Sequence, residues 1–235
     1  MTFRHLSVLV CDLDGTLVDS LPDLARALNR LLAERGRPPV APKKILSMVG
    51  DGVAKLVERG FLGTGAGLPA EEFDVALTRF LHIYDTVLTK ETRAYPEVRE
   101  TLEGLRSAGW RLAVCTNKPE KQSRRILDDL ELLPLFATVA GGDSFDAKKP
   151  DPRHLYDLLR RIAAEPRQTV MLGDAANDVL TAQRAGVPSV IVSFGYGGTA
   201  PASLGADRVI DRFSELPETL LELEAARRDA AARVP

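Results

Sequence analysis

Short, continuous apolar runs alternate along this chain with segments of helical periodicity, and this rhythm limits the possible folds more than any other feature. Four runs stand out, at residues 6–11, 111–115, 169–173 and 189–194, with weaker candidates at 136–141 and near 208. Runs without polar alternation are typical of strands buried on both faces. Helical patterns begin near residues 96, 119, 154 and 175. Strand alternating with helix predicts an α/β fold with a doubly wound, parallel sheet.

Residues 18–90 break this rhythm, because they contain helical patterns and no run that predicts a strand. The helical patterns begin near residues 21, 42, 51 and 69. We interpret residues 18–90 as a small all-helical cap inserted after the first strand. Residues 1–17 and 91–235 then form the catalytic α/β core, and 235 residues suit one main domain with such an insertion.

Composition excludes several classes of protein. The formal net charge is -2 and the basic residues are scattered, so we expect no nucleic-acid partner. The apolar run at residues 6–11 is far shorter than a signal sequence or a membrane span, which predicts a cytoplasmic protein without membrane contact. Cys11 and Cys115 belong to no metal-ligand spacing, and we expect both to be reduced and buried. The sequence leaves monomer and homodimer open.

Polar side chains follow the apolar runs, where doubly wound folds place their ligands. The candidates are Asp12, Asp14, Gly15, Thr16, Thr116, Asn117, Lys149, Asp174 and Asp178. Carboxylates gathered at one sheet edge repel one another unless a cation neutralises them. Oxygen ligands favour a hard divalent ion, and a few carboxylates completed by substrate oxygens and water suit Mg²⁺. We therefore expect Mg²⁺ as the cofactor.

A carboxylate beside such a metal can attack phosphorus and form a covalent aspartyl-phosphate. Thr116, Lys149 and the backbone N–H groups of the turn at Gly15 would then hold the phosphoryl oxygens. Their contribution would be largely electrostatic, because phosphoryl transfer depends on positioning and on stabilisation of charge in the transition state.

Four short motifs in this order carry a resemblance to a known family. They are Asp12-Leu13-Asp14-Gly15-Thr16-Leu17-Val18-Asp19-Ser20, then Thr116-Asn117-Lys118, then Lys149-Pro150, and finally Gly173-Asp174 with Asp178. Together they resemble the motifs of the haloacid dehalogenase superfamily of phosphatases, and the resemblance extends over essentially the whole chain. It implies a phosphatase with a small helical cap that closes over the site.

The resemblance also implies a role for each matching residue. Asp12 resembles the nucleophile, and Asp14 resembles the general acid that protonates the leaving alkoxide and then activates water. The side chains of Asp12 and Asp174 and the backbone carbonyl of Asp14 are expected to hold Mg²⁺, with Asp178 behind them on metal water or on Lys149. Thr116 and Lys149 resemble the phosphate-binding pair, supported by Asn117, and Gly15 and Thr16 belong to the same substrate-binding group.

Three further strings, at residues 50–54, 141–144 and 194–197, resemble bacterial phosphoglycolate phosphatases within the family. The expected substrate is therefore a small phosphorylated metabolite, with 2-phosphoglycolate preferred. Residues 50–54 and Lys55 are the expected readers of the substrate within the cap. A β-phosphoglucomutase-like phosphomutase, a pyrophosphatase, a general sugar-phosphate phosphatase and a noncatalytic sensor of a phosphometabolite remain as alternatives.

Overall fold

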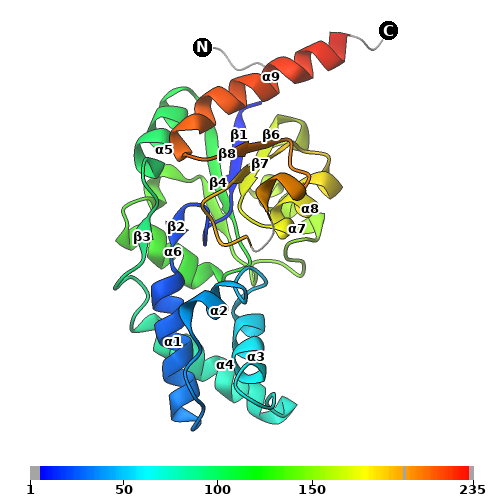
Figure 1. Ribbon diagram of the computed structural model, residues 1–235. Helices are drawn as coiled ribbons and strands as arrows, with labels where there is room; N and C mark the ends of the chain where they lie inside the picture. Colours follow the sequence, from blue (N-terminus) through cyan, green and yellow to red (C-terminus); the bar gives the residue numbers. More distant parts are fainter. Residues whose placement is uncertain (1–5, 198–199, 233–235) are drawn as a thin grey trace.

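The computed structural model describes residues 6–197 and 200–232, and its centre is a six-stranded parallel sheet (Figure 1). The strand order is β5-β4-β1-β6-β7-β8. The strands are β1 (Val8–Cys11), β4 (Arg111–Cys115), β5 (Thr138–Ala140), β6 (Thr169–Gly173), β7 (Ser189–Val192) and β8 (Arg208–Ile210). The expected α/β class and parallel sheet are confirmed, and the two weaker strand candidates are β5 and β8.

Helices cover both faces of this sheet. Successive residues of a strand point to opposite faces, so a strand that is apolar throughout needs helices packed on each face. They are α5 (Val98–Ser107), α6 (Glu120–Asp129), α7 (Pro152–Arg161), α8 (Ala176–Ala185) and α9 (Leu216–Ala232). On one face Leu9 and Leu172 belong to a cluster with residues of α5, α6 and α9. On the other face Val10 and Met171 pack with α7 and α8. The continuous apolar runs reflect this burial on both sides.

Four helices form the segment between the first strand and the rest of the sheet, and they lie at one end of the molecule (Figure 1). They are α1 (Leu21–Glu34), α2 (Pro42–Leu46), α3 (Val53–Leu62) and α4 (Ala70–Asp85). Their apolar faces pack on one another, and a Cβ added at Gly60 of α3 would lie 2.7 Å from Leu28 of α1. Helices are thus present for a cap, and the division at residues 17/18 and 90/91 stays a prediction.

The chain enters and leaves this helical segment through a short antiparallel ribbon. Strand β2 (Val18–Asp19) pairs with β3 (Arg93–Ala94), with Val18 opposite Ala94. The sequence predicted no strand within residues 18–90, and β2 corrects that prediction. Two residues are too few to leave a period-2 pattern, so only the pairing in space reveals this strand.

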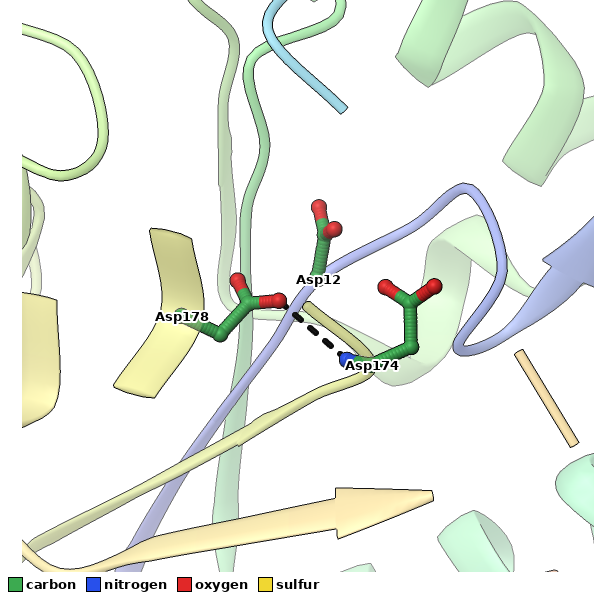
Figure 2. A group of neighbouring side chains, drawn as sticks. All are labelled: Asp12, Asp174 and Asp178. Atoms are coloured by element: carbon green, nitrogen blue, oxygen red, sulfur yellow. Dashed lines mark hydrogen bonds between the residues drawn. The ribbon is translucent and has the colours of Figure 1, made fainter. Parts of the chain in front are cut away.

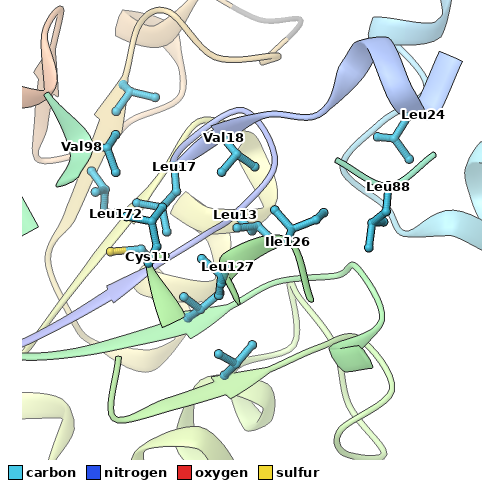
Figure 3. Packing of buried hydrophobic residues seen from close by; sticks show 14 of the residues in the cluster. Cys11, Leu13, Leu17, Val18, Leu24, Leu88, Val98, Ile126, Leu127 and Leu172 are labelled. Carbon is cyan, nitrogen blue, oxygen red and sulfur yellow. The ribbon is translucent and has the colours of Figure 1, made fainter. Parts of the chain in front are cut away.

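The apolar cluster continues from the sheet past the ribbon into the helical segment. Figure 3 shows Leu13, Leu17 and Val18 with Leu127 of α6 and Leu24 of α1, all members of that cluster. The two cysteines lie in different clusters and are free and buried, as expected. Within the described residues, none of the helices combines the length and apolar character needed to span a bilayer.

His154, at the start of α7, supports a prediction about acid stability. Its side chain is buried, edge-on to Phe145. Burial, aided by Lys149, lowers the pKa of His154 from 6.5 to about 4. Below pH 6.5 the unfolded chain therefore binds a proton at His154 that the folded chain does not, so the contribution of His154 to stability falls as the pH is lowered to about 4. The loss should approach about 1.4 kcal/mol per pH unit, up to about 3 kcal/mol.

The measurement compares the free energy of unfolding in urea for wild type and His154→Leu at several pH values between 7.5 and about 4.5. The stability difference between the two proteins should change steadily in favour of the variant as pH falls. Phe145→Leu is the matched control, because it alters the same contact without removing the titrating group, and its difference from wild type should stay constant. A pH-independent difference for His154→Leu would contradict the prediction.

Candidate active site

The expected site residues lie at the carboxyl ends of three neighbouring strands. Asp12 follows β1, Thr116 follows β4 and Asp174 follows β6, and β1 pairs with both of the other strands. Because the three strands are parallel and adjacent, their ends bring these side chains to one edge. All three are buried, and Asp12 is only 8% exposed. The edge thus gathers residues that are far apart in sequence.

The turn after β1 is shaped to let Asp174 approach. Gly15 has a φ of +83°, a conformation that glycine adopts without strain, and its N–H donates to the carbonyl of Val18 at 2.9 Å. A Cβ at this position would lie 2.3 Å from Oδ2 of Asp174. The hydroxyl of Thr16, which is fully buried, donates to Oδ1 of Asp174 at 3.4 Å. The structure therefore places Thr16 against the carboxylate of Asp174.

Three carboxylates form an acidic cluster at the carboxyl edge of the sheet (Figure 2). Asp12, Asp174 and Asp178 each offer an oxygen within 4.8 Å of the others. Asp178, in the first turn of α8, accepts hydrogen bonds at its Oδ2 from the backbone N–H groups of Asp174 (3.2 Å) and Ala175 (3.1 Å). Asp178 thus anchors the loop that carries Asp174.

Lys149 joins the cluster from the loop before α7. Its Nζ lies 2.9 Å from Oδ1 of Asp12 and donates to Oδ1 of Asp178 at 2.6 Å. Burial by itself would lower the pKa of Lys149, but the facing carboxylates of Asp12 and Asp178 raise it above its ordinary value. Lys149 is therefore a permanent positive charge beside the candidate nucleophile.

One lysine does not balance three carboxylates. Burial raises the pKa of Asp12 to about 6, against the opposing effect of Lys149. Burial, reinforced by Asp178 and Asp12, raises the pKa of Asp174 well above its ordinary value. The protein alone thus opposes full ionisation of the cluster, and a divalent cation would relieve this. The all-oxygen donor set suits Mg²⁺, so these residues fit the expected metal.

Thr116 and Asn117 close the site on the side of β4. The side-chain amide of Asn117 donates to the carbonyls of Lys149 and Gly50, each at 3.0 Å. Asn117 therefore holds the lysine loop and touches the loop before α3 at the same time. Thr116 lines a cavity together with Asp12 and Asp14, and its expected role in binding phosphate stays a prediction.

The helical segment covers this cavity through the loop before α3. Gly50 and Gly52 line it, and Asn177 of α8 donates to Oδ1 of Asp51 at 2.8 Å. The cavity has a free volume of ≈ 30 Å³, room for a few water-sized groups. Lys55 lies elsewhere: it is exposed, pairs with Glu58 and borders a separate hollow between α3 and α4. The structure thus supports the loop, and not Lys55, as a wall of the site.

Lys118, which has no role assigned from the sequence, is central to the site. Its ammonium donates to both oxygens of Asp14, at 2.9 and 3.0 Å, and to the hydroxyl of Tyr84 in α4, at 2.7 Å. Ser20 also donates to Asp14, at 2.5 Å. Lys118 adjoins Thr116-Asn117 in the second motif, but nothing local indicates that its side chain turns inward.

Tyr196 was also missed, although it lies within the string at residues 194–197. Its backbone N–H donates to Oδ2 of Asp174 at 2.7 Å, and its hydroxyl donates to Asp19 at 2.6 Å. The same hydroxyl accepts from the backbone N–H groups of Ser20 (2.6 Å) and Leu21 (2.9 Å). One tyrosine thus connects the acidic cluster to the start of α1.

Clustered carboxylates and a buried lysine at the carboxyl edge of a doubly wound sheet are typical of the active site of an enzyme. Comparison with known proteins makes the class specific. The family model of haloacid dehalogenase-like hydrolases matches residues 9–192. The chain belongs to this family, and the resemblance stated from the four motifs is confirmed.

Individual relatives agree with this assignment. The phosphoglycolate phosphatase of Caulobacter vibrioides is 42% identical over 217 residues, 92% of each chain. That of Agrobacterium fabrum is 39% identical and covers 99% of this chain and 100% of its own. A crystal structure of a predicted phosphoglycolate phosphatase from Haemophilus somnus 129pt has a TM-score of 0.88 at 32% identity, covering 93% of this chain and 100% of its own. The enzyme class is therefore that of the phosphatases, the phosphoric monoester hydrolases.

Proposed function

We propose that this phosphatase is Mg²⁺-dependent, forms an aspartyl-phosphate on Asp12, and prefers 2-phosphoglycolate. The observation that carries the proposal is the contact of Asp12 with Lys149 inside a buried cluster that includes Asp174 and Asp178. A carboxylate in such a place has a partner for the phosphoryl charge and a position for a cation. The names of the relatives, phosphoglycolate phosphatases at 36–42% identity, support the choice of substrate.

In the first half-reaction a carboxylate oxygen of Asp12 attacks phosphorus, and the bond from phosphorus to the ester oxygen breaks. Lys149 and Thr116 hold the phosphoryl oxygens while charge redistributes in the transition state. Asp14, which lines the cavity beside Asp12, gives its proton to the leaving alkoxide. The products of this step are glycolate and phosphorylated Asp12.

In the second half-reaction the ionised Asp14 takes a proton from water, whose oxygen attacks the phosphorus of the aspartyl-phosphate. The bond between phosphorus and Asp12 then breaks, which releases inorganic phosphate and restores the carboxylate. Asp14 is protonated again and ready for the next turnover. The same residue thus serves as acid and then as base.

The side chains of Asp12 and Asp174, with the backbone carbonyl of Asp14, would hold Mg²⁺. When bound, the ion would neutralise the crowded carboxylates and draw negative charge from the phosphoryl group. Asp178 would keep the Asp174 loop and Lys149 in place through the hydrogen bonds described above. The narrow cavity under the helical segment favours a small substrate and limits the access of bulk water.

A substrate panel tests this proposal. Phosphate release is measured from 2-phosphoglycolate, pyrophosphate, sugar phosphates and nucleoside monophosphates, with Mg²⁺ and with excess chelator. We expect kcat/KM for 2-phosphoglycolate to exceed the others by about 100-fold, and activity to disappear without the metal. A flat profile would contradict the substrate assignment, and undiminished turnover in chelator would contradict the metal.

The same panel separates the alternative reactions. Release of one phosphate per substrate consumed, without any isomer of a sugar phosphate, would exclude a phosphomutase. A preference for pyrophosphate or for sugar phosphates would support those alternatives in turn. Turnover of any substrate by the purified protein would exclude a noncatalytic sensor.

A further inference from the structure

We infer that Lys118 recognises the carboxylate of the substrate, and so determines the preference for a phosphorylated acid over a neutral phosphate ester. The inference rests on the proposed function and assigns the residue that sets its specificity. Lys118 is buried, and it takes no part in either of the two half-reactions described above.

Lys118 lies in the wall of the cavity and not on the surface. It is 3% exposed, and it borders the cavity next to Asp14 and Thr116. The ring of Tyr84 lies beneath the ammonium, with Nζ 4.8 Å from the ring centroid, and the tyrosine hydroxyl accepts from it at 2.7 Å. The helical segment thus holds the ammonium in place in the wall of the cavity, next to Asp14.

The remaining walls explain why a charge at this point matters. Leu24, Val49, Val53 and Leu56 make the wall on the helical side apolar. Among the described residues that line the cavity, Lys118 is the only one with a cationic side chain. A carboxylate that leaves water for such a space loses its hydration and is costly unless a counter-charge meets it. Lys118 is the counter-charge that this cavity provides: it contacts both oxygens of Asp14, at 2.9 and 3.0 Å, and its charge becomes available to a substrate carboxylate when Asp14 carries the proton that the first half-reaction requires.

The other nearby lysines are unsuited to this role. Lys149 is engaged by Asp12 and Asp178, on the side where phosphorus must lie. Lys148 is exposed and donates to the backbone carbonyl of Asp51 at 3.1 Å. Lys55 borders a separate hollow. None of these three lysines therefore offers its charge to the part of the cavity where the substrate carboxylate would lie.

The position of Lys118 also fits the length of a glycolate ester. In 2-phosphoglycolate one CH₂ group separates the ester oxygen from the carboxylate, so the two are about 3 Å apart by ordinary bond geometry. Asp14, the proposed donor to the ester oxygen, lies 2.9 Å from the Lys118 ammonium. A substrate whose ester oxygen meets Asp14 therefore brings its carboxylate within reach of Lys118.

The test compares two substrates, 2-phosphoglycolate and 2-hydroxyethyl phosphate, which differ only at the end that carries the carboxylate or, in its place, a neutral hydroxymethyl group. For each, kcat/KM is measured with Mg²⁺ for wild type, Lys118→Met, Lys118→Arg and the control Lys55→Met. We expect wild type to prefer the acid by about 100-fold, and Lys118→Met to lose most of this preference through a fall on 2-phosphoglycolate of about 100-fold. Lys118→Arg should retain part of the preference, and Lys55→Met all of it.

The outcomes distinguish a failure of the role inferred for Lys118 from a failure of the proposed substrate. If wild type prefers the acid and Lys118→Met keeps that preference, or loses both substrates equally, Lys118 only positions its neighbours and the inference is overturned. If wild type shows no preference, the proposed substrate is itself wrong and the inference falls with it. Thermal melting establishes that each variant is folded. Should Lys118→Met not fold, an unchanged preference in Lys118→Gln, which removes the charge but keeps a polar side chain, would overturn the inference equally.

Discussion

Asp12→Asn should abolish turnover, with kcat on 2-phosphoglycolate falling by about 10⁴-fold or more. An amide oxygen is a poor nucleophile, and the variant also lacks one of the negative charges that would hold the metal. The exchange is nearly isosteric, so the backbone of the turn and the neighbours of Asp12 keep their places. Steady-state phosphate release with saturating Mg²⁺ measures the effect.

The stability of the same variant serves as an internal control. Because burial raises the pKa of Asp12 to about 6, the folded protein without a cation opposes ionisation of this group at neutral pH. Asp12→Asn should therefore melt at or above the wild-type temperature in excess chelator. Asp128→Asn, an exposed change on α6, should alter neither activity nor melting. Residual activity of Asp12→Asn near wild type would show that Asp12 is not the nucleophile.

Asp14→Asn should separate the two halves of the reaction. An amide cannot donate the proton that the glycolate alkoxide needs, so we expect kcat on 2-phosphoglycolate to fall by about 10³-fold. Acetyl phosphate has a leaving group that needs no protonation, and it should still phosphorylate Asp12. The phosphorylated protein should then accumulate, because no base activates water for the second step.

Intact-mass measurement after mixing with acetyl phosphate and Mg²⁺ detects this accumulation. The double variant Asp12→Asn with Asp14→Asn is the control and should acquire no phosphate. If Asp14→Asn hydrolyses acetyl phosphate at the wild-type rate, Asp14 does not activate water. If it is not phosphorylated at all, Asp14 has a part in the first step beyond donating a proton.

The arrangement of the sheet could be predicted from the sequence because its signals are local. Runs such as 169–173 are buried on both faces, and burial selects apolar residues at every position of the strand. Chain direction and the crossover rule then place Asp12, Thr116 and Asp174 at the same edge. The convergence of these residues followed from strand order and needed no knowledge of side-chain contacts.

The contacts of Lys118 and Tyr196 could not be predicted in the same way. Lys118 is buried because Asp14 and Tyr84, 104 and 34 residues away along the chain, both face it. A lysine next to a turn is more often exposed, and local pattern carries no information about partners so distant. The two-residue pairing of β2 with β3 was missed for the same reason.

The sequence by itself determined the class of fold, the family and the set of candidate catalytic residues, because periodicity and motif order are properties of neighbouring residues. Only the tertiary structure decided which charges meet. It placed Lys149 between Asp12 and Asp178, directed Thr16 toward Asp174, and separated Lys55 from the cavity that Lys118 borders. Electrostatic interaction depends on distance and burial in space, and a folded chain sets both through contacts between segments far apart in sequence.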